Sequence, residues 1–176
     1  MASSRSLTIR LKRHADGSAS ITLTRSDGSV TWQRQNGKLA LVFPPHDITH
    51  FAVESVLGFT SGFYGLVADG WEISDFAAPY PRGEIPGEAR EVEAWVGLFD
   101  GFRRDKDAMD AEALNAEARR VLTDSRFAAI TTARTLSPDD VRRVRERRNE
   151  LLGQWHALAG GESIELAFER TPTGAA

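Results

Sequence analysis

Residues 7–43, LTIRLKRHADGSASITLTRSDGSVTWQRQNGKLALVF, decide the fold class. Apolar and polar residues alternate within this stretch, as in Leu7-Thr8-Ile9-Arg10-Leu11, and a two-residue period is typical of a half-buried strand. Dipeptides that favour hairpin turns separate the alternating segments: Asp16-Gly17, Asp27-Gly28 and Asn36-Gly37. The stretch therefore predicts an antiparallel meander that ends in an apolar strand over residues 39–43.

The rest of the chain has mainly helical patterns. Pro44-Pro45 predicts the end of the last meander strand and the start of a helix over residues 46–57, which Gly58 stops. Further helices are expected over 88–99, 107–122 and 138–158, and Ser137 caps the last of them, with acids in its first turn. Residues 163–170 alternate again and predict a strand that rejoins the sheet, because a lone apolar-faced strand must pair somewhere.

These elements predict an α+β fold. We expect an antiparallel sheet of four to five strands, packed by about four helices, in one domain over residues 1–170. Residues 171–176 are expected to form a disordered tail.

Composition excludes several classes of site. The chain has 176 residues and no cysteine, so thiol nucleophiles, thiolate metal sites and disulfide scaffolds are excluded, and any metal must be held by His, Asp or Glu. The net charge of -3 argues against a nucleic-acid binder, and no apolar run reaches the roughly 20 residues that span a bilayer. We therefore expect a cytoplasmic bacterial protein without a membrane partner. The sequence leaves open whether the protein forms a homodimer.

The helix predicted over residues 46–57 carries the candidate chemistry. With about 100° between successive residues, His46, His50, Glu54 and Asp47 share one sector, and most of the remaining circumference is apolar. A helix that is apolar nearly all round is normally buried. Its one polar sector holds only histidines and acids, without any Lys, Arg, Asn or Gln.

Two histidines four residues apart on a helix can both reach one divalent ion. Glu54 lies one turn further and could be a third ligand, or it could accept a histidine N–H and fix the tautomer. Asp47 lies in the first helical turn, where an acid is favoured by the helix dipole, and it could also be a general base.

The segment His46-Asp47-Ile48-Thr49-His50 resembles the HExxH helix of zincin metallopeptidases, with Asp at the usual Glu position. The resemblance implies His46 and His50 as zinc ligands and Asp47 as the catalytic base. Gluzincins take a third ligand from a later Glu, and the resemblance implies Glu72 for this role. It covers five residues and one downstream acid.

Two functional hypotheses follow. The first is a small metal-binding protein, with zinc as the expected ion, which hydrolyses a small-molecule or peptide substrate. The second is a non-enzymatic binding or assembly module, in which the His and acid sector is a structural polar seam or an interface. In the second case, the arginine-rich segment 142–148 would dock an acidic partner, although the acids around it are typical of a solvated helix face.

Overall fold

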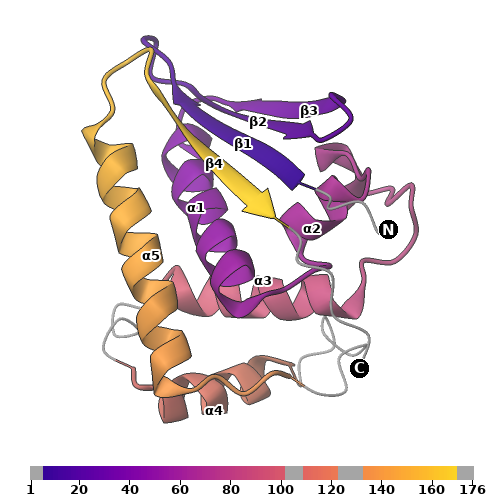
Figure 1. Cartoon of the computed structure of the whole chain (residues 1–176), viewed down its shortest axis with the longest axis vertical. Helices are drawn as coiled ribbons and strands as arrows, with labels where there is room; N and C mark the ends of the chain where they lie inside the picture. The colour runs from indigo at the N-terminus through magenta and orange to yellow at the C-terminus, as the bar shows by residue number, and fades with distance from the viewer. Residues whose placement is uncertain (1–5, 102–108, 123–132, 170–176) are drawn as a thin grey trace.

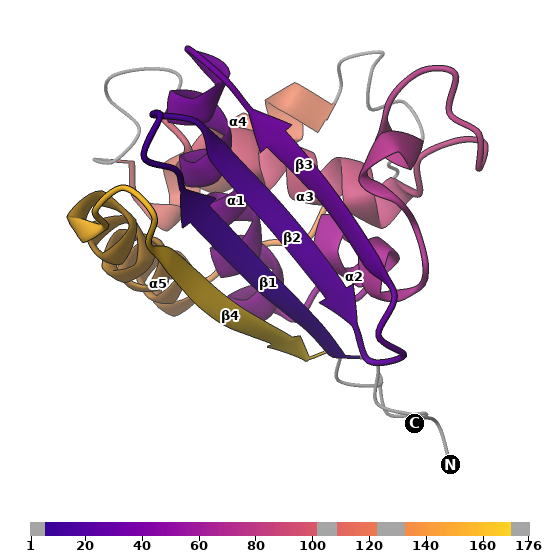
Figure 2. The same ribbon diagram turned by 90° about the horizontal axis from the view of Figure 1, so that it is seen from above.

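A computed structural model describes residues 6–101, 109–122 and 133–169 of the chain. In this part, four strands form one antiparallel sheet in the order β3-β2-β1-β4 (Figure 1). The strands are β1 (Ser6–Arg13), β2 (Ala19–Arg25), β3 (Val30–Gln35) and β4 (Ser163–Glu169). The helices lie behind the sheet in Figure 2, so they cover one of its faces. The predicted α+β class is confirmed.

The first two predicted hairpins are confirmed. Strand β1 pairs with β2 so that Ile9 lies opposite Leu23, and the turns place Gly17 and Gly28 at φ of 82° and 85°. On the other side of β1, the C-terminal strand rejoins the sheet, with Ile9 opposite Leu166. The inward positions of these strands are buried, as the alternation predicted.

The predicted strand over residues 39–43 is wrong. These residues form the first turns of α1 (Leu39–Leu57), with Pro44 and Pro45 inside the helix. Asn36-Gly37 starts a helical turn rather than a hairpin, and the amide of Leu39 donates to the carbonyl of Asn36 at 3.2 Å.

Tertiary packing explains this difference. In the helix, small Ala40 packs into the core and is 5% exposed, while Leu41 is 75% exposed. An apolar pentapeptide suits a helix and a strand equally by pattern, so the packing of Ala40 and Pro44 decides between them. The predicted stop at Gly58 is confirmed, since this residue adopts φ of 68° after the last helical turn.

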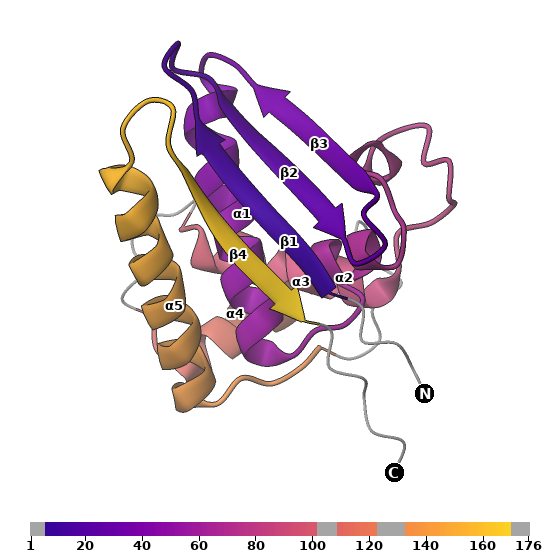
Figure 3. The same ribbon diagram turned by 45° about the horizontal axis from the view of Figure 1, so that its top comes forward.

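The remaining helices are α2 (Phe63–Ala68), the short 3-10 helix η1 (Ile73–Phe76), α3 (Gly87–Phe99), α4 (Ala111–Leu122) and α5 (Pro138–Ala157). Of these, α2, α3 and α5 pack against α1, whereas α4 packs against α3 and the short η1 lies against β3. The expected helices near 88–99 and 138–158 are confirmed, and Ser137 and Asp140 form the expected cap of α5. The expected start of α4 at residue 107 and the tail at 171–176 lie outside the described residues. Figure 3 shows α5 beside α1 at the β4 side of the sheet.

Helix α1 lies between two hydrophobic clusters. Ile48 and Phe51 join the cluster against the sheet, whereas Ala52 and Val53 join the cluster formed with α3, α4 and α5. The prediction of a helix buried on most of its circumference is therefore confirmed. No helix in the described parts of the chain is long and apolar enough to cross a membrane.

Candidate metal centre

The two histidines of α1 lie side by side. His46 and His50 are one turn apart, with ring centroids 4.8 Å from each other and ring planes at 82°. The side chain of His46 is 27% exposed and that of His50 only 3%. The pair is thus at the boundary between the protein interior and a surface opening.

A carboxylate holds each ring through its Nδ1 atom. Nδ1 of His46 is 2.7 Å from Oδ2 of Asp100, and Nδ1 of His50 is 3.2 Å from Oε1 of Glu54. When Nδ1 donates to a carboxylate, the Nε2 lone pair is available to a metal, which is the usual arrangement of ligating histidines. In both rings Nδ1 lies against a carboxylate, which leaves Nε2 as the nitrogen that could reach a metal ion.

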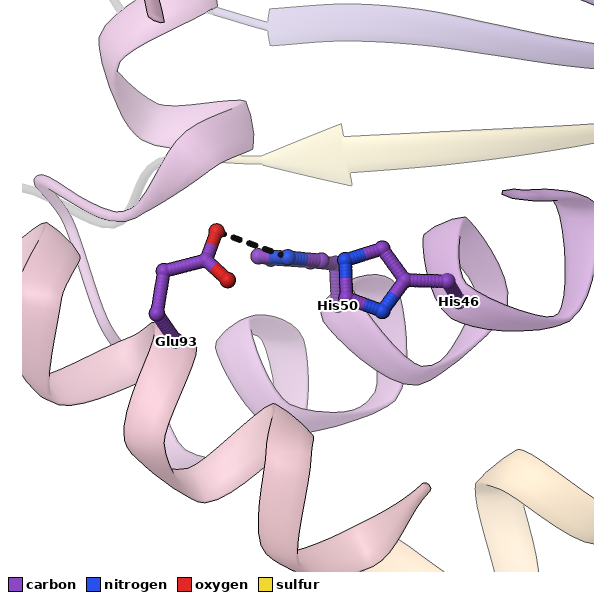
Figure 4. Close-up of side chains that lie close together, drawn as sticks. All are labelled: His46, His50 and Glu93. Atoms are coloured by element: carbon purple, nitrogen blue, oxygen red, sulfur yellow. Dashed lines mark ion pairs between the residues drawn. The ribbon is translucent and has the colours of Figure 1, made fainter. Parts of the chain in front are cut away.

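Glu93 of α3 completes the group. Its Oε1 lies 3.1 Å from Nε2 of His50, and one potential ligand atom each from His46, His50 and Glu93 lie within 4.8 Å of one another. Figure 4 shows the carboxylate of Glu93 opposite the edge of the His50 ring, with one nitrogen of His46 turned toward them. We call these three residues the His/His/Glu triad.

The donor set of the triad suits zinc. Two imidazoles and one carboxylate with an open fourth position are a known catalytic arrangement, and zinc bonds of about 2.1 Å place tetrahedral ligand atoms roughly 3.4 Å apart. The triad atoms are more widely spaced than this, so the ligands must draw together. The side chain of Glu93 is 51% exposed and can move to close the site.

Glu54 contacts the ring nitrogen of His50 that Glu93 does not contact. Its carboxylate is fully buried, accepts from the backbone amides of Tyr64 and Gly65 at 3.0 and 3.3 Å, and contacts Nδ1 of His50. A Cβ on Gly62 would lie only 2.5 Å from this carboxylate. The glycine-rich segment after α1 is thus shaped around Glu54, which orients His50 while Glu93 is in the triad.

Charges around His50 favour its protonated form when no metal competes. Burial by itself lowers the pKa of His50, but hydrogen bonds to Glu54 and Glu93 outweigh it and raise the pKa to about 10. In turn, burial opposes the ionisation of Glu93, yet the hydrogen bond with His50 lowers the pKa of Glu93. A metal ion must therefore displace a proton from Nε2 of His50, as is general for histidine ligands.

Asp47 lines the same pocket as the histidine pair. Burial raises the pKa of Asp47 to about 7, against the opposing effects of His50 and His46. Its backbone carbonyl accepts the hydroxyl of Tyr64 at 2.9 Å, which anchors this turn of α1. A carboxyl group that exchanges protons near neutral pH is suited to general acid-base chemistry.

Glu72, which the zincin resemblance suggested, lies in a different environment. Its carboxylate pairs with Arg25 at 3.0 Å, and its backbone amide donates to Asp75 at 2.8 Å. Among the described residues, Glu93 and not Glu72 lies beside the two histidines, and the sequence pattern did not predict this. Its only signal was its place in a predicted helix next to the core residue Val92, and this pattern does not reveal which helix faces Glu93.

A network from α5 supports His46. The hydroxyl of Thr49 bonds to Asp100, the partner of His46, and accepts from Nε of Arg148 at 2.9 Å. Arg142 and Arg147 pair with acids on their own helix, as expected for a solvated face. Arg148 departs from that expectation, since its side chain is only 15% exposed and lies 3.7 Å from Asp100.

The triad opens into a pocket of about 290 Å³. Residues from α1, α2, β2, β3, η1 and α3 line it, so the open side of the site is formed by segments far apart in the sequence. The other two histidines, His14 and His156, line a separate pocket near Trp155 and take no part in the triad. No protein-family model matches the sequence, and comparisons with curated proteins and with solved structures found no match.

Proposed function

We propose that this protein binds a divalent metal ion, zinc by its ligand chemistry, through His46, His50 and Glu93, and that it is a metal-dependent hydrolase. One observation carries the proposal. Each histidine has its Nδ1 beside its own carboxylate, and Nε2 of His50 faces Glu93, where a metal ion could take the place of the proton that these two groups share. Carboxylate-held histidines of this kind are the normal surroundings of metal ligands.

The residues around the triad fit hydrolysis. A zinc ion in such a site supplies Lewis-acid activation of water and of a substrate carbonyl. Asp47 would accept the proton that water loses as its oxygen bonds to the acyl carbon. The same carboxyl would return that proton to the leaving oxygen or nitrogen as its bond to the acyl carbon breaks. The reaction thus balances without an oxidant, a reductant or another co-reactant.

A second candidate function follows from the protonation of His50. With both ring nitrogens hydrogen-bonded to carboxylates, His50 forms a closed polar seam, and every buried side-chain N and O atom in the described residues has a partner. In this case, the site stabilises the fold of a binding or assembly module without any metal. The two candidates differ in whether the purified protein retains zinc.

Metal analysis separates them. The protein is loaded with zinc, dialysed and analysed for metal beside the double variant His46→Ala/His50→Ala, and we expect stoichiometric zinc only in the unmodified protein. Glu93→Gln should weaken zinc binding, whereas Glu72→Gln, a matched change at the acid paired with Arg25, should not. Protein that holds no zinc and whose melting temperature zinc leaves unchanged would support the polar seam.

A further inference from the structure

The pocket beside the triad has apolar walls. Six apolar side chains from four elements and the residue after η1 line it: Ile21, Phe43, Phe63, Ile73, Phe76 and Ala77. The three phenylalanines among them are only partly buried, so they present aromatic surface to the pocket. Phe63 lies 5.6 Å from the ring of His50 and 4.8 Å from the ring of Phe76, between centroids. Aromatic surface therefore reaches directly to the proposed metal ligands.

Among the described residues that line this pocket, none is a lysine or an arginine. Besides the triad, Asp47 and Gln33 are the polar lining residues, and the amide of Gln33 is neutral. Arg148 contacts Asp100 and Thr49 and is not part of the pocket wall. The walls away from the metal ligands therefore offer no side-chain cation to pair with a charge on the far end of a ligand, and burying an unpaired charge against apolar surface is costly.

A smaller cavity continues the apolar space past Glu93. It measures about 160 Å³, shares Phe63, Phe76 and Glu93 with the first pocket, and adds Ile85 and Ala89. Phe63 and Phe76 thus lie between two apolar cavities, and both cavities are also lined by Glu93, a proposed metal ligand. A flat ring that stacks on these two side chains would place an attached carbonyl group beside the triad.

We infer that the site takes an uncharged small molecule whose reacting carbonyl is attached to an aromatic or branched apolar group, and that it rejects anionic analogues. This inference rests on the proposed metal-dependent function. Burial of a phenyl-sized group against such walls is worth about one to two orders of magnitude in affinity. A carboxylate at the far end of that group would lose this gain, because it would be buried against apolar walls without a cationic side chain to pair with it.

Three hydroxamates test the inference on zinc-loaded protein by calorimetry. Each binds zinc through the same chelating group, so differences in affinity between the probes measure how the attached group interacts with the pocket walls. We expect benzohydroxamate to bind at least about tenfold more tightly than acetohydroxamate, and 4-carboxybenzohydroxamate to lose this advantage. Equal binding of the phenyl and methyl probes, or tight binding of the carboxylate probe, would overturn the substrate class.

Two variants locate the effect. Phe76→Ala should remove the preference for the phenyl probe and leave zinc content and acetohydroxamate binding unchanged. Gln33→Lys, at an exposed strand position where the fold is not at risk, should restore binding of the carboxylate probe. If neither variant changes the probe ranking, the proposed pocket is wrong. Loss of zinc from the unmodified protein would instead overturn the metal site itself, and the metal analysis detects this separately.

Discussion

The carboxylate of Glu54 lies 3.2 Å from Nδ1 of His50, one turn earlier on the same helix, and both side chains are buried. The same carboxylate is fixed by the backbone amides at the start of α2. This contact couples the proposed metal site to the fold, because the orientation of His50 depends on a second helix.

Replacement of Glu54 by Gln should weaken zinc binding without unfolding the protein. Glutamine keeps the size of the side chain and can still accept from the amide of Tyr64, but it removes the charge that orients His50. Changes in the outer shell of a metal site usually cost about 10- to 100-fold in affinity. Competition with a zinc chelator measures the effect, and Glu150→Gln on the exposed face of α5 is the control. Unchanged affinity would show that Glu54 only fills space.

Asp100→Asn should weaken zinc binding by a comparable factor of about 10 to 100, since Asp100 orients His46. The side chain of Asp100 is 10% exposed. Its carboxylate accepts a hydrogen bond from the hydroxyl of Thr49 and also contacts Nδ1 of His46. The matched control is Asp139→Asn, an exposed acid paired with Arg142. Equal zinc affinity in both variants would argue against a role of Asp100 in the site.

Asp47→Asn should lower the rate of zinc-dependent ester or amide hydrolysis by about 10²- to 10⁴-fold, the usual contribution of a general base. The amide has the shape of the carboxyl group but cannot accept the proton from water. Zinc content should stay unchanged, because Asp47 is not in the triad. An active Asp47→Asn variant would remove this residue from the proposed chemistry and leave the metal site intact.

Gly62→Ala should destabilise the protein by about 1–3 kcal/mol, as overpacking of an interior usually does. The backbone of Gly62 has φ of -75°, which alanine adopts freely, so the cost comes only from the contact with Glu54. In contrast, Gly153→Ala on the exposed side of α5 meets no atom within 4 Å and should stabilise the protein by up to about 1 kcal/mol. Urea unfolding of both variants measures these differences, and equal midpoints would contradict the predicted contact.

The cap of α5 should make stability depend on pH. Hydrogen bonds from the backbone amide and the hydroxyl of Ser137 lower the pKa of Asp140 below its usual value of 3.8. Because the folded-state pKa is the lower one, the cap contributes fully above that usual value and is lost as the pH falls through the folded-state pKa. The loss of stability in Asp140→Asn, measured by urea unfolding, should therefore be larger at neutral pH than at about pH 3. A difference that does not change with pH would contradict this role.

Local chemistry made most of the sheet and the helix ends predictable. The turns at Asp16-Gly17 and Asp27-Gly28, the cap at Ser137 and the stop at Gly58 depend on conformations that neighbouring residues impose on one another. Residues 39–43 are the exception. Their apolar pattern suits a strand and a helix equally, and the burial of Ala40 and Pro44 in the folded protein decides for the helix.

The four-residue spacing was enough to predict that His46 and His50 are neighbours, since an α-helix places residues four apart on one face whatever surrounds it. The spacing could not predict that Glu93 lies beside the pair, that Asp100 and Arg148 are next to His46, or that Phe63 and Phe76 line the opening. The period of a helix sets the direction of a side chain but not the helix that it meets. That choice depends on how the apolar faces of α1, α2, α3 and α5 pack together.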